Sequence, residues 1–169
     1  MTLVAGPVML PTPAGVTRVD VETAREMFAA VEEALPADVA ILVAAVADWR
    51  AADESGQKIK KDGSGNPAPL ALAENPDILA TPAHHPKRPG LLVGFAAETE
   101  KVVDHATAKR ARKGADWIVA NDVSGDVMGG ATNTVHLVTT DGVEHWPNMP
   151  KAAVAVRLIE RIADDLDAR

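Results

Sequence analysis

The sequence has no cysteine, no tyrosine and few other aromatic residues, namely three Trp and two Phe in 169 positions. Without cysteine there are no disulfides, no thiolate nucleophile and no cysteine-ligated zinc, which agrees with a reducing cytoplasm. With so few aromatic rings, the hydrophobic core must be built from Val, Ala, Leu and Ile. We therefore expect a cytoplasmic protein whose fold depends on aliphatic packing.

Long apolar runs and excess positive charge are also missing. No run approaches the roughly 20 apolar residues of a membrane span, and the N-terminus MTLVAGPVMLPTPAG lacks the basic region of a signal peptide. The net charge of −7 and the pI near 5.2 argue against nucleic acid as a partner, because binding a phosphate backbone requires a basic face. We expect one domain over residues 1–169 that contacts neither a membrane nor nucleic acid.

What is present is an alternation of buried strands and amphipathic helices. Apolar, β-branched runs predict strands at Thr2–Val4, Val39–Ala47, Leu91–Ala97 and Trp117–Ala120. Helices are predicted after a cap at Asp20, over Asn75–Ala83, over Lys101–Lys113 with Gly114 closing it, and from Pro150 onward. This order predicts an α/β, Rossmann-like fold with a mostly parallel sheet and helices on both faces.

Two segments depart from this alternation. Residues 50–69 are polar and rich in glycine, so we expect a mobile loop that carries the lysine cluster KIKK, Lys58 to Lys61. Residues 134–146 contain two strand-like runs around Asp141-Gly142, which is a strong turn signal and predicts a β-hairpin extension near the C-terminus.

Charged side chains follow the predicted strands. Asp48 and Glu98 each come directly after a buried strand, and Lys109 and Lys113 share one helix face at i and i+4. The carboxyl ends of parallel strands open into a crevice where ligands bind. Lysines delivered to such a crevice indicate an anionic ligand, most simply a phosphate.

Several of these pieces occur together in a fixed order: AAVADWR from Ala44, KIKK, NPDIL from Asn75, GFAAET from Gly94 and ANDVS. In that order and spacing the chain resembles the phosphopantothenate–cysteine ligase family of coenzyme A biosynthesis, along essentially its whole length. The resemblance implies that 4′-phosphopantothenate is activated by CTP to an acyl-cytidylate, which the amine of cysteine then converts to 4′-phosphopantothenoylcysteine. It also implies magnesium with the triphosphate and a homodimer.

The resemblance assigns roles to particular residues. Lys58 matches the family's loop lysine and is expected to stabilise charge at the acyl phosphate. The expected nucleotide contacts are Ala44, Asp48, Lys58, Asn75, Pro76, Asp77, Ile78, Phe95, Lys109 and Lys113. Among these, Asp48, Phe95 and the Asn75–Ile78 segment are expected to form the base and sugar pocket. No metal ligand and no cysteine-binding residue is assigned.

One departure from the family pattern bears on activity. Members begin with a further strand, a glycine-rich loop and an SSGKMG-like segment that binds triphosphate and the acyl substrate, and this sequence contains no such segment. We therefore expect an N-terminally incomplete ligase-like domain, either because another chain supplies the segment or because the sequence is truncated. The alternative is a nucleotide-binding or dimerisation module without independent catalysis, and ATP in place of CTP remains open.

Each candidate also has a plain structural interpretation. Asp48 and Glu98 serve equally as strand-end or helix caps, the lysines as a solvated surface, Asn75-Pro76 as a helix start and Phe95 as core. For Glu98 we favour the helix cap. The five histidines are not expected to form a ligand set, because His136 has no second histidine at coordinating spacing. An NAD(P) oxidoreductase is disfavoured, since no G-x-G-x-x-G follows a first strand.

Overall fold

The computed structural model describes residues 1–53, 69–124 and 130–169. The strands are β1 (Thr2–Ala5), β2 (Thr17–Asp20), β3 (Val39–Leu42), β4 (Trp49–Ala51), β5 (Leu72–Glu74), β6 (Leu91–Glu98), β7 (Trp117–Asp122), β8 (Thr132–Val138) and β9 (Val143–Pro150). The helices are α1 (Ala24–Glu33), α2 (Ala80–His84), α3 (Val102–Lys113) and α4 (Lys151–Asp167). No helix in the described ranges is long and apolar enough to cross a membrane.

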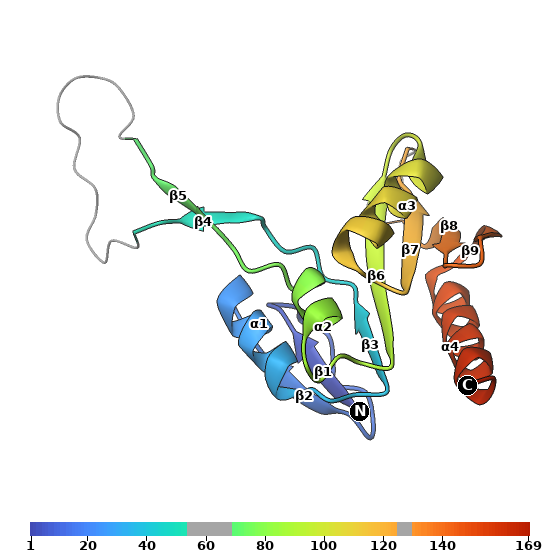
Figure 1. Ribbon diagram of the computed structural model, residues 1–169, viewed down its shortest axis with the longest axis horizontal. Coiled ribbons are helices and arrows are strands. Elements are labelled where there is room, and N and C mark those ends of the chain that lie inside the picture. The colour runs from blue at the N-terminus through green and yellow to red at the C-terminus, as the bar shows by residue number, and fades with distance from the viewer. Residues whose placement is uncertain (54–68, 125–129) are drawn as a thin grey trace.

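The central sheet has the strand order β3-β6-β7-β8-β9 within the described residues (Figure 1). β3, β6 and β7 are parallel to one another, as the alternation of strand and helix predicts. β8 and β9 add an antiparallel hairpin at one side of the sheet. The expected α/β architecture is confirmed, and the hairpin, which runs from Thr132 to Pro150, is longer than the predicted 134–146.

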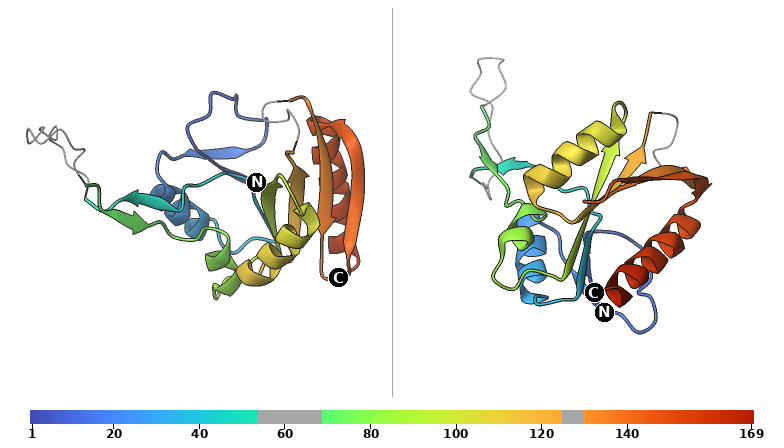
Figure 2. Two further views of the ribbon diagram at one scale, coloured as in Figure 1. Left: turned by 90° about the horizontal axis from the view of Figure 1, so that it is seen from above. Right: turned by 45° about the vertical axis from the view of Figure 1, so that its right-hand side comes forward.

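Helices cover both faces of this sheet, and each face has its own apolar core. Figure 2 shows α3 and α4 on opposite sides of the strands. On the α4 side, Trp146 packs with aliphatic residues of β6, β7 and β8 and with Val154, Leu158 and Ile162. On the other side, small and aliphatic residues of the strands pack against Ala83 of α2 and Ala106 of α3. Aliphatic burial of this kind contributes about 1.5–3 kcal/mol per large side chain.

Gly94, in the middle of β6, allows helix α2 to approach the sheet closely. A Cβ atom at this position would lie 2.6 Å from Cδ2 of Leu79 and 2.9 Å from Cδ1 of Ile118, closer than real Cβ contacts. A larger residue here would force the Leu79 and Ile118 side chains to shift, so glycine lets Leu79, just before α2, pack directly over the strand. The NPDIL segment is held against β6 for this reason.

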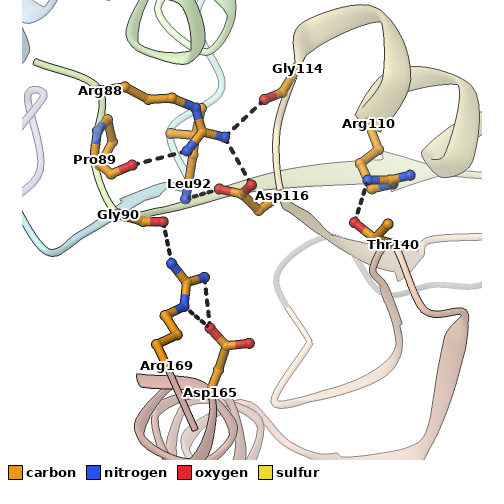
Figure 3. A network of polar contacts seen from close by, with 10 residues as sticks. All are labelled: Arg88, Pro89, Gly90, Leu92, Arg110, Gly114, Asp116, Thr140, Asp165 and Arg169. Carbon is orange, nitrogen blue, oxygen red and sulfur yellow. Dashed lines mark hydrogen bonds and ion pairs between the residues drawn. The ribbon is translucent and has the colours of Figure 1, made fainter. Parts of the chain in front are cut away.

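The Asp116 side chain fixes the start of β6, because β7 begins only at Trp117 and provides no strand partner for the Leu92 amide. The Asp116 carboxylate accepts hydrogen bonds from the Leu92 amide at 2.7 Å and from the Arg88 guanidinium at 2.9 Å (Figure 3). Leu92 is fully buried, so its amide would otherwise lack a partner. Arg169, near the end of α4, donates to the Gly90 carbonyl at 2.6 Å and brings the C-terminus to the same place.

β1 and β2 form a separate parallel pair that is not hydrogen-bonded to β3. Within the described residues β1 pairs only with β2, and β3 pairs only with β6, so each strand has one free edge. Apolar side chains remain exposed here: Ile41 is 38% exposed and Val43 is 60% exposed. The fold therefore consists of a continuous sheet and a two-stranded unit with unpaired strand edges between them.

β4 and β5 pair antiparallel and form an arm that extends away from the rest of the molecule (Figure 1). The arm lies at the ends of the segment predicted as the loop 50–69, of which residues 54–68 are outside the described part of the chain. Trp49 and Leu72 on the arm are 58% and 55% exposed. Of the predicted segment, Arg50 and Ala51 belong to β4, and β5 begins at Leu72, just after the segment ends.

Some predicted boundaries were wrong. The strand expected over Val39–Ala47 ends at Leu42, where its pairing with β6 stops although β6 itself continues to Glu98. The first helix is capped by Thr23, not Asp20, through a capping box with Glu26. The helix expected from Asn75 begins at Ala80 instead. The helix ending at Gly114, which has φ 68°, and the helix following Pro150 lie where they were predicted.

Candidate functional site

The candidate site lies where β3 and β6 end at their carboxyl sides. A cavity of about 460 Å³ opens between the segment that follows β1 and the segment that follows β3. Gly6 and Pro7 line it on one side, and Ala44, Ala47 and Asn75 line it on the other. The predicted residue Ala44 is exposed to this cavity. A ligand here would contact strand-end backbone groups, as in other open α/β sheets.

Asn75 joins the NPDIL segment to the end of β3. Its side chain donates to the Ala47 carbonyl at 2.8 Å, and its backbone amide donates to the Asp48 carbonyl at 2.8 Å. Arg50 reinforces this junction by donating to the Glu74 carbonyl and, at 3.4 Å, to the Asn75 amide oxygen. Asn75 therefore holds two segments together and does not cap a helix. The structure brings the predicted residues Asp48 and Asn75 side by side.

Asp77 connects this junction to helix α3. One carboxylate oxygen accepts from the amides of Leu79 at 3.2 Å and Ala80 at 2.9 Å. The other oxygen forms an ion pair with Lys113. Partial burial acts to raise the pKa of Asp77, but the Lys113 contact and the two amides outweigh it and hold the pKa below its ordinary value.

Lys109 lies one turn before Lys113 and is partly buried. Its ammonium donates to the Phe95 carbonyl on β6 at 2.8 Å. Burial lowers the pKa of Lys109, the nearby Glu98 carboxylate opposes this, and Lys113 and Arg112 add repulsion. The i, i+4 spacing thus places both lysines on one face of α3, where Lys109 contacts the Phe95 carbonyl of β6 and Lys113 contacts Asp77.

The remaining predicted residues differ in how accessible they are to a ligand. Asp48 is exposed and Pro76 is half-buried. Ile78 is 8% exposed and belongs to the core. The ring of Phe95 packs against the α4-side core, so the residue contributes its carbonyl to the site and its ring to the fold. Lys58 lies outside the described residues.

Two other expectations change with the structure, and one residue of the site was missed. Glu98 does not cap α3, which begins after Lys101; its carboxylate contacts His105 at 3.2 Å. Arg50 was not singled out from the sequence, although its place directly after AAVADW is the available signal. The expectation that His136 has no histidine partner is wrong, because register places His145 directly opposite it on β9.

The Asp77–Lys113 contact gives a testable dependence of stability on pH. Because the folded pKa of Asp77 is depressed, its stabilising effect is present above its ordinary value of 3.8 and is lost as the pH falls through the folded pKa. We expect Asp77→Asn to lower the free energy of unfolding by about 1 kcal/mol at neutral pH, since an exposed pair is screened, and by much less near pH 3. Urea unfolding at both pH values measures this.

Asp77→Asn keeps an oxygen for the Leu79 and Ala80 amides, so Asp77→Ala serves as the comparison that also loses those bonds. The alanine variant is expected to be less stable than the asparagine variant. An asparagine effect of equal size at both pH values would show that the carboxylate charge is not its source.

Comparison with known proteins decides the family. Residues 1–166 match the sequence profile of the family described as DNA/pantothenate metabolism flavoprotein C-terminal domain. The chain belongs to this family. It is 42% identical over 173 residues to the coenzyme A biosynthesis bifunctional protein CoaBC of Escherichia coli strain K12, covering 100% of this chain and 43% of that protein. The chain thus spans less than half the length of this relative.

Solved structures of the family share the fold. A crystal structure of the C-terminal domain of CoaBC superposes with a TM-score of 0.80 at 35% identity, covering 99% of this chain and 75% of that one. The DNA/pantothenate metabolism flavoprotein from Streptococcus pneumoniae superposes with a TM-score of 0.77 at 18% identity, covering 96% and 80%. The second likeness supports the fold alone.

Proposed function

We propose that this chain provides the nucleotide-binding part of a phosphopantothenate–cysteine ligase, and so acts in coenzyme A biosynthesis. The observation that carries the proposal is the convergence of Lys109, Lys113 and Asp77 beside the Asn75 junction, where β3 ends next to Gly94 and Phe95 of β6. The name of the Escherichia coli relative, 42% identical over the whole chain, supports the pathway. The order of the sequence motifs supports the reaction.

The proposed reaction has two steps. The carboxylate of 4′-phosphopantothenate attacks the α-phosphorus of CTP, a P–O bond forms, and pyrophosphate leaves. The amine of cysteine then attacks the acyl carbon of the acyl-cytidylate, loses a proton, and displaces CMP as the C–O bond breaks. Both steps require that two anions are held close together and that their negative charge is neutralised. Positioned cations and backbone N–H donors can meet both requirements.

Lys109 and Lys113 have the properties that phosphate binding requires. An ammonium carries three N–H donors, and each lysine uses one of them on an acceptor of the chain. The remaining donors have no other partner among the described residues, so they can contact phosphate oxygens while the first bond holds the side chain in place. Burial of Lys109 adds to this, because a desolvated cation attracts an anion more strongly.

The other assignments follow from the order of the sequence motifs. Asp48 offers an exposed carboxylate, and the half-buried residues Asn75 to Asp77 offer backbone and side-chain groups, for the base and sugar. Ala44 allows close approach at the cavity wall. Lys58 is proposed to stabilise charge at the acyl phosphate and lies outside the described residues.

Magnesium enters this proposal as part of the nucleotide. The described residues include no group of three or more His, Cys, Asp or Glu side chains that could hold a metal ion. Mg²⁺ keeps several waters and binds nucleotides through phosphate oxygens, so a protein cage is not required. The residues of this chain would then act on the triphosphate–metal complex as a whole.

The free edges of β1 and β3 favour a second possibility for how the chain works. A parallel strand from another polypeptide, or from a longer form of this one, is proposed to pair there and to supply the family's glycine-rich segment. Without that strand, the chain would bind nucleotide without catalysing ligation.

We further propose a homodimer through the β8–β9 hairpin, because β9 is an edge strand within the described residues. Sedimentation velocity measures the oligomeric state.

Isothermal titration of CTP with magnesium tests the proposal directly. We expect one binding event for CTP and weaker binding for ATP, with a higher melting temperature in the presence of CTP. The control is the same titration with ATP and with magnesium alone. A folded chain that shows no heat with either nucleotide would contradict a nucleotide site made by these residues, and equal affinity for both would remove the preference for cytosine.

A further inference from the structure

Two histidines face each other across the β8–β9 hairpin. His136 on β8 is directly opposite His145 on β9 in the register of the pair. Their Nδ1 atoms are 2.8 Å apart, with ring centroids 4.7 Å apart and ring planes at 77°. Neither residue has a role in the proposed ligase reaction.

The two rings are accessible and lie on a polar part of the sheet. His145 is exposed and His136 is half-buried. On the same face, Asn148 donates to the Thr134 hydroxyl at 3.4 Å beyond the pair, and the Asp122 carboxylate of β7 attracts the His136 ring. Asp122 is itself held by the amide and hydroxyl of Ser124, at 3.0 and 2.6 Å.

We propose that His136 and His145 form a two-histidine site for a divalent transition-metal ion, preferentially Cu²⁺. Imidazole nitrogens suit Cu, Ni and Zn, whereas Mg²⁺ and Ca²⁺ prefer oxygen ligands. The two Nδ1 atoms are the ligands, and water fills the remaining positions. The site is independent of the nucleotide site and does not rest on the proposed function.

The separation of the two nitrogens favours one geometry. Metal–imidazole bonds of about 2.0 Å place neighbouring ligands about 2.9 Å apart in a square plane and about 3.3 Å apart in a tetrahedron. The observed 2.8 Å is close to the square-planar value. Tetragonal coordination is typical of Cu²⁺ and Ni²⁺, and Cu²⁺ binds most tightly in the divalent series.

The strand pairing suits ligation. The strand register fixes both Cβ positions, so binding requires only rotation of the rings. The metal replaces the Nδ1–H···Nδ1 hydrogen bond with two coordinate bonds. The ring that donated this hydrogen bond moves its proton from Nδ1 to Nε2 through solvent, and no redox step or co-reactant is involved.

Titration of the full, untagged chain with Cu²⁺ tests this proposal. We expect one ion per chain, tighter than Zn²⁺, with the affinity falling by about tenfold or more in His136→Asn and in His145→Asn. His84→Asn, a histidine at the end of α2, is the matched control and should bind as the unaltered chain does. Equal affinity in all four proteins would overturn the proposal.

Electron paramagnetic resonance of the Cu²⁺ complex provides a second readout that needs no variant. A tetragonal spectrum with coupling to two imidazole nitrogens is expected from the unaltered chain. A spectrum with one imidazole nitrogen or none would overturn the proposal even if a histidine variant failed to fold. Circular dichroism confirms the fold of each variant before titration.

Discussion

Replacing Lys109 and Lys113 together with glutamine is expected to weaken binding of CTP with magnesium by about a hundredfold or more. Each charge-assisted hydrogen bond contributes about 1.5–3 kcal/mol, and about 1.4 kcal/mol corresponds to a tenfold change in affinity. The two ammonium groups are the charges that the structure brings to the strand ends, on the Phe95 carbonyl and the Asp77 carboxylate. Isothermal titration at fixed ionic strength measures the loss.

A matched control separates this local effect from the loss of overall positive charge. Lys87→Gln combined with Lys151→Gln also removes two positive charges, and both side chains are exposed. This control should retain affinity within a few-fold at moderate salt, where distant charges are screened. Equal weakening in both double variants would mean that the lysines attract nucleotide only through net charge, and the proposed site would be wrong.

Trp146→Ala is expected to have the largest effect on stability. Trp146 is 1% exposed and packs between β8 and helix α4, with Val154 and Leu158 in the same cluster. Truncating a buried tryptophan costs about 3–5 kcal/mol in the free energy of unfolding. The Arg157 guanidinium, 4.8 Å from the ring centroid, also loses its aromatic contact. Chemical denaturation with fluorescence and circular dichroism measures the change.

Trp49→Ala is the comparison for this prediction. Trp49 is 58% exposed on the β4–β5 arm, so the same truncation there should change stability by no more than about 0.5 kcal/mol. If the two variants lost similar amounts of stability, packing against α4 would not be the reason for the effect at Trp146.

The elements predicted correctly are those with long, consistent patterns. β6 and β7 are continuous apolar runs buried on both faces, and α4 has a regular apolar side after Pro150. The strands that were missed, β2, β4 and β5, have only three or four residues and mixed polarity. Such strands form because a partner is present, and that information lies elsewhere in the chain.

The part of the candidate site that depends on a local sequence pattern was predictable, and the part that depends on distant contacts was not. The i, i+4 spacing of Lys109 and Lys113 follows from helix geometry alone. The partner of Lys113 is Asp77, 36 positions earlier, and no local pattern indicates that contact. Similarly, the meeting of His136 and His145 depends on strand register, which the turn and the bulge between Asn133 and Val135 determine. Asn75 resembled a helix start because Pro76 follows it, but its side chain donates a hydrogen bond to the Ala47 carbonyl instead.

The free edge of β3 has a consequence for how the chain behaves in concentrated solution. An unpaired strand edge presents amide and carbonyl groups that a strand of another molecule can join, which is a common route to aggregation. Ile41 and Val43, both exposed at or just beyond this strand, would add apolar contact to such pairing. The net charge of −7 opposes it by repulsion between copies. Solubility of the isolated chain should therefore fall as salt increases, and recover when a strand occupies the edge.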